Sequence, residues 1–148
     1  MKPEIARVLE VCAIDLMGDI APNVAPSYRQ ATVLSTAVIL TSIREELDRI
    51  AERRVDENRA LRALFSEAGD AIEDADLRSR VADAAAGDET DFRISALDAA
   101  NTVLRALLIE LHTHVESQGS AAARRVETSI WRELCASTER RRLSLGAF

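Results

Sequence analysis

Glycine and proline are scarce in this 148-residue chain, which has five glycines and three prolines. A β-sandwich or β-barrel with many turns needs more of both, because its turns use these residues for their backbone geometry. No run of β-branched residues alternates with polar ones, so no strand is expected. The chain is 47% hydrophobic, which suffices for a sizeable core and excludes global disorder.

Aromatic residues are also rare, at 3%, and the formal net charge is −6. Binding of nucleic acid needs a basic face and benefits from aromatic stacking platforms, so this composition argues against it. The longest uncharged stretch, residues 30–43, is too short to cross a bilayer, and no signal-peptide pattern is visible. We therefore expect no association with a membrane, and a cytoplasmic location.

Only two cysteines occur, Cys12 and Cys135, and their spacing matches no metal motif. Both fall among apolar helical residues, where a thiol acts as a small hydrophobe. Charge is unevenly spread: residues 67–98 hold ten acids and three bases, whereas residues 124–148 hold six bases and three acids. These surfaces are interpreted as solvated faces, with mutual docking in a dimer as the alternative.

Apolar residues recur at helical spacing along most of the chain, which predicts an all-α fold. We expect an antiparallel up-and-down bundle of four main helices plus one or two short ones, in a single domain over residues 1–148. Asp56, Thr90 and Ser120 are expected to cap helices. The main helices are predicted at residues 3–20, 27–54, 90–117 and 120–142, and the short ones at residues 56–69 and 74–86.

Some apolar residues fall off the main stripes of their helices: Val11, Ile14, Val38, Ile39 and Ile109. Left exposed, they would form a larger apolar patch than monomers usually carry. A second helical layer within the chain or a second copy of it would cover them. We favour the second copy, and expect a homodimer that serves as a non-catalytic accessory or interaction protein.

Both histidines lie in one helical segment, as His112 and His114. At about 100° per residue they point roughly 160° apart, so they cannot chelate one ion together. Glu110 and Glu116 sit at i,i+4 spacing from them and resemble ordinary helix-surface partners. With no inward-facing Glu-x-x-His pair and no G-x-S-x-G, the sequence predicts no catalytic residue, no metal ligand and no cofactor.

Two E-x-x-D patterns occur, at residues 45–48 and 73–76. Paired acids of this kind can hold magnesium where the carboxylates converge on one cavity. Here Glu45 points away from the apolar stripe, and the second pattern stands at a helix start, where acids complement the dipole. Both are interpreted as surface and capping residues.

Arg44 lies within roughly 60° of the centre of its helix stripe, where a guanidinium must reach solvent or find a carboxylate. Asp48 follows one turn later, and Asp15 and Asp19 lie at the edge of the preceding helix. A structural salt bridge is the favoured interpretation. The alternative is a ligand-binding pocket for a small anion or a partner's carboxylate. The competing function is a small-molecule-binding or divalent-metal-dependent enzyme whose site lies between the first two helices.

One pattern in the N-terminal part is familiar: residues 18–22 (GDIAP), then Tyr28 and Arg29, and then residues 33–47. It resembles a family of small bacterial helical proteins of unknown function, encoded beside aminoglycoside-phosphotransferase-like kinases and acyl-CoA dehydrogenases. Ser35 and Thr36 stand where that family has Ala and Asn, and about the first 65 residues are covered. The resemblance implies an accessory role, with a kinase-like or acyl-CoA enzyme as a possible protein partner, and supplies no catalytic residues.

Overall fold

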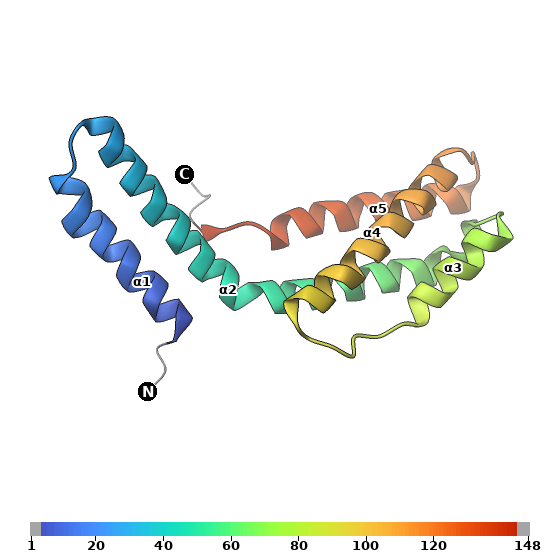
Figure 1. Cartoon of the computed structure of the whole chain (residues 1–148). Coiled ribbons are helices and arrows are strands. Elements are labelled where there is room, and N and C mark those ends of the chain that lie inside the picture. The colour runs from blue at the N-terminus through green and yellow to red at the C-terminus, as the bar shows by residue number, and fades with distance from the viewer. Residues whose placement is uncertain (1–3, 145–148) are drawn as a thin grey trace. The chain divides into compact units, whose positions relative to one another are not determined.

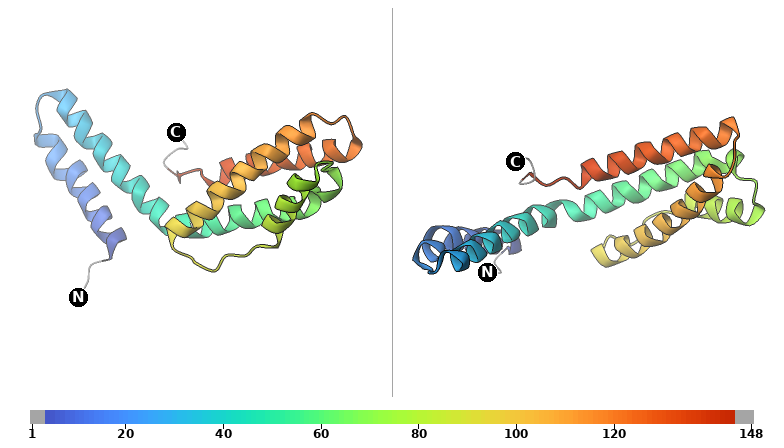
Figure 2. Two further views of the ribbon diagram at one scale, coloured as in Figure 1. Left: turned by 45° about the vertical axis from the view of Figure 1, so that its right-hand side comes forward. Right: turned by 90° about the horizontal axis from the view of Figure 1, so that it is seen from above.

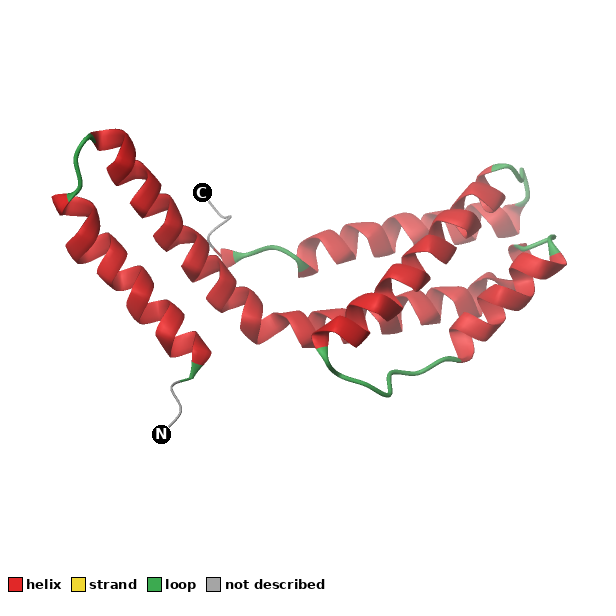
Figure 3. Cartoon of the chain, in the orientation of Figure 1, coloured by secondary structure: helices red, strands yellow, loops and turns green. Residues whose placement is uncertain are grey.

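The computed structural model describes residues 4–144 as helices joined by turns and short loops, with no strand in that range (Figures 1 and 3). This confirms the all-α prediction. Among the described helices, none combines the length and apolarity needed to cross a membrane. The α-helices are α1 (Ile5–Asp15), α2 (Ser27–Ala68), α3 (Ala75–Ala86), α4 (Ile94–Glu116) and α5 (Ala121–Arg140), and the short turns are η1 (Leu16–Ile20, π-helical), η2 (Ala21–Asn23) and η3 (Gly69–Ala71).

The long helix α2 corrects the prediction of two helices separated near residue 55. It continues without interruption from Ser27 to Ala68, because no glycine or proline occurs between these residues. Asp56 is therefore not a cap. Its carboxylate instead accepts a hydrogen bond from Arg59, one turn further along the same helix.

The predicted helix starts at Asp74 and Ser120 are confirmed, whereas the start at Thr90 is wrong, as is the one at Asp56. The Asp74 carboxylate accepts from the N–H of Leu77 (2.9 Å) at the start of α3, and the Ser120 hydroxyl accepts from the N–H of Ala123 (3.0 Å) at the start of α5. Thr90, however, lies in an exposed loop, and α4 begins at Ile94. In that loop, the Asp91 carboxylate accepts hydrogen bonds from the backbone N–H and the guanidinium of Arg93 (both 3.0 Å). The helix therefore begins only after Arg93.

The chain divides into two compact units. The first unit contains residues 4–50 with Leu143 and Ser144, and the second contains Ala51–Arg142. The single domain expected over residues 1–148 stays a prediction. Each unit has its own pattern of burial, and that pattern decides what its surface can do.

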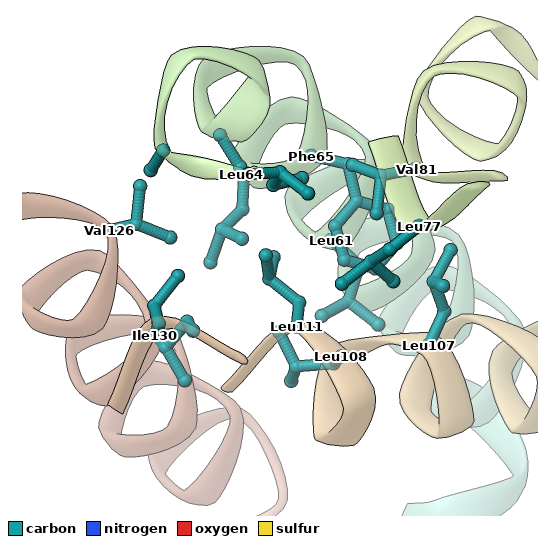
Figure 4. Packing of buried hydrophobic residues seen from close by; sticks show 14 of the residues in the cluster. Leu61, Leu64, Phe65, Leu77, Val81, Leu107, Leu108, Leu111, Val126 and Ile130 are labelled. Carbon is teal, nitrogen blue, oxygen red and sulfur yellow. The ribbon is translucent and has the colours of Figure 1, made fainter. Parts of the chain in front are cut away.

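The second unit encloses a continuous hydrophobic core between the C-terminal half of α2 and helices α3, α4 and α5 (Figure 4). Phe65, Ile72, Leu111 and Ile130 are among its fully buried side chains. Each comes from a different segment, so the core ties those segments together. At about 25 cal/mol per Å² of buried apolar surface, burial of such side chains stabilises the unit by roughly 1.5–3 kcal/mol apiece.

The first unit is a helical hairpin in which α1 lies beside the N-terminal half of α2, as the views in Figures 1 and 2 agree. Its described buried hydrophobic residues are all alanines: Ala13, Ala21 and Ala37. Alanine on facing helices lets the two backbones approach closely, but it contributes little apolar area. The hairpin therefore lacks the large interior side chains that the second unit has.

Candidate functional site

The most extensive candidate site is the apolar exterior of the hairpin. Twelve of the seventeen large hydrophobic side chains exposed in the described residues belong to the first unit. We call this set the hairpin surface. Its members are Ile5, Val8, Val11, Ile14, Met17, Ile20, Tyr28, Leu34, Val38, Ile39, Ile43 and Leu47.

Helical spacing gathers part of the hairpin surface into rows. Ile39, Ile43 and Leu47 follow one another at intervals of four, so they share one face of α2. On α1, Ile5 and Val8 are three residues apart and also share a face. Sequence analysis found five residues off the main stripes, of which Val11, Ile14, Val38 and Ile39 belong to this surface. The fifth, Ile109, is exposed on α4 in the second unit.

Cys12 lies between these apolar residues on α1, and Cys135 lies on α5 in the second unit. Both thiols are free and exposed. The expectation that each serves as a small core hydrophobe is therefore wrong for the described chain. At both positions the helix turns the cysteine side chain toward solvent.

The predicted ligand-binding residues of the hairpin occupy different environments. Arg44 is half-buried, and its Nε atom is enclosed without a hydrogen-bond partner among the described residues. Asp15, Asp19 and Asp48 are all exposed. No ion pair joins any of these three to Arg44 in residues 4–144. A binding role for the four residues stays a prediction.

The positive charge of Arg44 acts on the Glu10 carboxyl of α1, an acid that the sequence did not single out. A hydrogen bond from Arg7 (2.8 Å) lowers the pKa of the Glu10 carboxyl, and the positive charge of Arg44 lowers it further. The register of α1 against α2 explains why the sequence did not indicate Glu10. Helical periodicity places Asp15 and Asp19 at the edge of a stripe, but only the turn length decides which acid of α1 lies near Arg44.

Neither E-x-x-D pattern behaves as a metal pair. Glu45 accepts hydrogen bonds from the backbone N–H (3.0 Å) and hydroxyl (2.6 Å) of Ser144 and from Arg49 (2.7 Å). The bonds from Ser144 lower the pKa of Glu45. In the second pattern, Asp74 caps α3, as described above, and the cap bond lowers the pKa of its carboxyl. Both acids serve the surface and capping roles expected for them.

A buried polar network in the second unit went unrecognised in the sequence. Glu57 of α2 is only 1% exposed. Its carboxylate accepts from Arg141 (2.8 and 3.0 Å), Arg54 (2.8 Å) and Ser137 (2.8 Å). Arg54 also pairs with Asp98 of α4. The network thus joins α2, α4 and the end of α5, and it satisfies a charge that would otherwise be costly to bury.

Opposing effects act on the ionisation of Glu57. Burial raises the pKa of its carboxyl, but the hydrogen bonds from Arg141 and Ser137 and the positive charge of Arg141 outweigh burial and lower the pKa to about 2. Glu57 therefore stays ionised at neutral pH. A permanently charged carboxylate with every partner on the protein is a structural link between helices and makes a poor general acid or base.

The two histidines have separate roles, as their helical spacing predicted. His114 Nε2 accepts from the backbone N–H of Glu73 (3.1 Å), which ties α4 to the segment before α3. His112 lies edge-on to the Trp131 ring of α5, with ring centroids 5.5 Å apart. Its Nε2 atom is 3.4 Å from Glu116 Oε1.

Glu127 of α5 completes a cluster that sequence spacing could not reveal. One ligand atom each from His112, Glu116 and Glu127 lies within 4.8 Å of the others. Two of these residues share a face of α4 at i,i+4 spacing, which was visible in the sequence. The third comes from another helix, so only packing brings it to the pair.

Comparisons with known proteins add no relative: no protein-family model, no curated protein and no solved structure matches the chain.

Proposed function

We propose that the chain is a non-catalytic accessory or interaction protein that acts as a homodimer through the hairpin surface. The observation that carries the proposal is the contrast within the first unit, where twelve large hydrophobic side chains are exposed and the buried ones are alanines. A unit of this size without a core of its own depends on oligomerisation or another partner for stability.

The area of the hairpin surface suits a second copy of the chain. At roughly 80 Å² per half-exposed aliphatic side chain, the twelve residues present about 1,000 Å², compared with about 800 Å² per partner in a standard interface. Monomers rarely expose contiguous apolar patches beyond a few hundred Å². Coverage of about four fifths of the surface would reach the standard size.

Symmetry favours association with a second copy of the chain over association with a different protein. A two-fold dimer needs only one self-complementary patch, and two hairpins packed by their apolar faces make four helices around a shared core. The antiparallel bundle within one chain is likewise proposed, with α1, α2, α4 and α5 as its four main helices and α3 as the short one. In the dimer, the second copy supplies the layer that covers α1 and the N-terminal half of α2.

Sedimentation velocity and light scattering between about 1 and 100 μM test the proposal. We expect a particle of twice 16.2 kDa. Ile39→Glu, at a side chain 56% exposed in the hairpin, should shift the protein to monomer because it places a charge in the interface. Ile109→Glu is the matched control, since that side chain is 68% exposed in the second unit, and it should leave the dimer intact.

A strict monomer at tens of micromolar would refute the homodimer. Dissociation by Ile109→Glu with no effect of Ile39→Glu would place the interface elsewhere and refute the role of the hairpin surface. Thermal stabilisation by nucleotides or acyl-CoA in the same samples would favour the alternative, a small-molecule-binding or divalent-metal-dependent enzyme with a site between the first two helices. The kinase-like or acyl-CoA enzyme suggested as a partner by the resemblance is tested by adding such an enzyme to the dimer.

A further inference from the structure

We propose that His112, Glu116 and Glu127 form a binding site for a divalent transition-metal ion of the zinc type. The three residues lie on α4 and α5 in the second unit. The site is separate in sequence from the hairpin surface and does not depend on dimer formation. It combines one imidazole and two carboxylates, which are the protein ligands of many open metal sites.

The first support is distance. Zinc bonds of about 2.0–2.1 Å to nitrogen and oxygen place neighbouring ligands of a tetrahedral site about 3.3 Å apart. His112 Nε2 and Glu116 Oε1 are 3.4 Å apart, which already matches that spacing. All three ligand atoms lie within 4.8 Å of one another. A side-chain rotation that moves the Glu127 carboxylate by about 1.5 Å would close the set, without a change in either helix.

The second support is the state of the imidazole. His112 Nε2 is enclosed and makes no hydrogen bond of acceptable geometry within the described residues. A buried ring nitrogen normally has a hydrogen-bond partner, and the approach of this one to Glu116 Oε1 at 3.4 Å lacks hydrogen-bond geometry. An ion bound between the nitrogen and the carboxylates would satisfy all of them. The imidazole also forms a T-shaped pair with the Trp131 ring, with centroids 5.5 Å apart, and this contact limits its rotation.

Charge and ligand type define the ion. Two carboxylates close together repel each other, and a divalent cation bound with a neutral imidazole cancels their charge. Magnesium and calcium prefer sites made of oxygen alone, whereas an imidazole favours zinc, cobalt, nickel or copper. Three protein ligands leave at least one coordination position for water, since zinc is at least four-coordinate.

The chain supplies its own reporter for the test. Trp131 is the only tryptophan, and its ring contacts the proposed ligand His112. Bound Co²⁺ or Cu²⁺ quenches the fluorescence of a nearby indole. Titration of tag-free protein with CoCl₂ should therefore quench the emission and saturate at one ion per chain. Calorimetry with ZnCl₂ should give the same stoichiometry, and MgCl₂ should give neither signal.

Substitutions assign the ligands. Glu127→Gln keeps the shape of the side chain and should weaken Co²⁺ and Zn²⁺ binding by at least about tenfold, and Glu116→Gln should do the same. His112→Gln should abolish saturable quenching. His114→Gln is the matched control, because it removes the only other histidine, which lies two residues away and bonds the Glu73 N–H. It should change the affinity less than twofold, with circular dichroism showing that each variant is folded.

Absence of one-to-one binding of both Zn²⁺ and Co²⁺ at micromolar concentrations would overturn the proposal. Equal affinity in wild type and Glu127→Gln would also overturn it, because the ion would then be bound elsewhere. If His112→Gln fails to fold, the two Glu→Gln variants decide the question alone. The exposed Glu116 can be substituted without loss of buried surface.

Discussion

The two units of the chain use the same secondary structure to opposite ends. The second unit buries leucine, isoleucine and phenylalanine side chains and encloses a fully paired carboxylate, Glu57. The hairpin buries alanines and leaves its large aliphatic side chains exposed. Helical periodicity is present in both. What differs is whether a third helix covers the apolar face, so amphipathicity alone does not reveal whether a face is core or interface.

The largest expected difference in stability is between truncation of a buried leucine and truncation of an exposed one. Leu111→Ala, at a side chain 0% exposed, should lower the free energy of unfolding by about 2–5 kcal/mol, because it leaves a cavity among α2, α4 and α5. Leu47→Ala, at a side chain 39% exposed, should cost less than about 1 kcal/mol in dilute protein. Urea unfolding followed by Trp131 fluorescence measures both.

The dependence on protein concentration distinguishes the same two substitutions further. If the hairpin surface is an interface, Leu47→Ala should weaken the dimer, and its cost should grow as the protein concentration rises. The cost of Leu111→Ala should not depend on concentration in that way. Equal costs for the two substitutions in dilute protein would contradict the difference between the units.

Acid should destabilise the second unit through Glu57. The folded-state pKa of about 2 lies below the unfolded value of 4.5, so the group contributes stability above pH 4.5 and loses it as pH falls toward 2. The full shift corresponds to about 3 kcal/mol, and solvent screening of the half-exposed Arg141 reduces the contribution to about 2 kcal/mol.

Glu57→Gln isolates that contribution. The variant should be less stable than the wild type at pH 7, and the difference should shrink below about pH 4.5, where the Glu57 carboxylate protonates in the unfolded wild type but not yet in the folded one. Urea midpoints between pH 3 and 7 measure it. A constant difference across this range would show that the charge of Glu57 is not the source of the stability.

Helix caps give a smaller contrast. Ser120→Ala should cost about 1 kcal/mol, because it removes the side-chain acceptor for the N–H of Ala123 at the start of α5. Helix α1 begins after Glu4 without a side-chain cap bond. Glu4→Ser should therefore raise the thermal midpoint of the hairpin by supplying one. Circular dichroism melts of the two variants check both signs.

Ion pairs give the smallest effect. Arg62 and Glu89 in the second unit are 17% and 12% exposed, and a double-mutant cycle with alanine should yield a coupling of about 0.5–1 kcal/mol. The exposed pair Arg7 and Glu10 on α1 should yield no coupling above experimental error. A coupling for the α1 pair as large as that of Arg62 and Glu89 would contradict this difference between the two units.

Local signals in the sequence predicted the elements well, and their failures have local causes. Ser120 and Asp74 begin helices because a side-chain acceptor two or three residues before a free N–H acts without help from distant residues. Asp56 and Thr90 carry the same signal but do not begin helices. At Asp56 the surrounding residues continue the helix, and at Thr90 the loop residue Asp91 captures the neighbouring N–H.

Site residues were less predictable, since they depend on contacts between helices. Glu57 appears in the sequence as one acid among 25, and only packing against Arg141 and Ser137 marks it as the centre of a network. The sequence identified Arg44 as an unusual position, and its Nε atom is enclosed, but the acid whose pKa its charge lowers is Glu10, which the sequence did not indicate.

Composition and periodicity by themselves determined that this protein is helical, because helix formation depends on residues within one turn of each other. They also determined that some apolar residues lie outside the main apolar stripe of their helix. Only the tertiary structure decided which of those residues are core and which are surface, and that His112 meets a glutamate 15 positions later. The physical reason is that burial and ligand convergence depend on distances between helices, which turns and side-chain packing set.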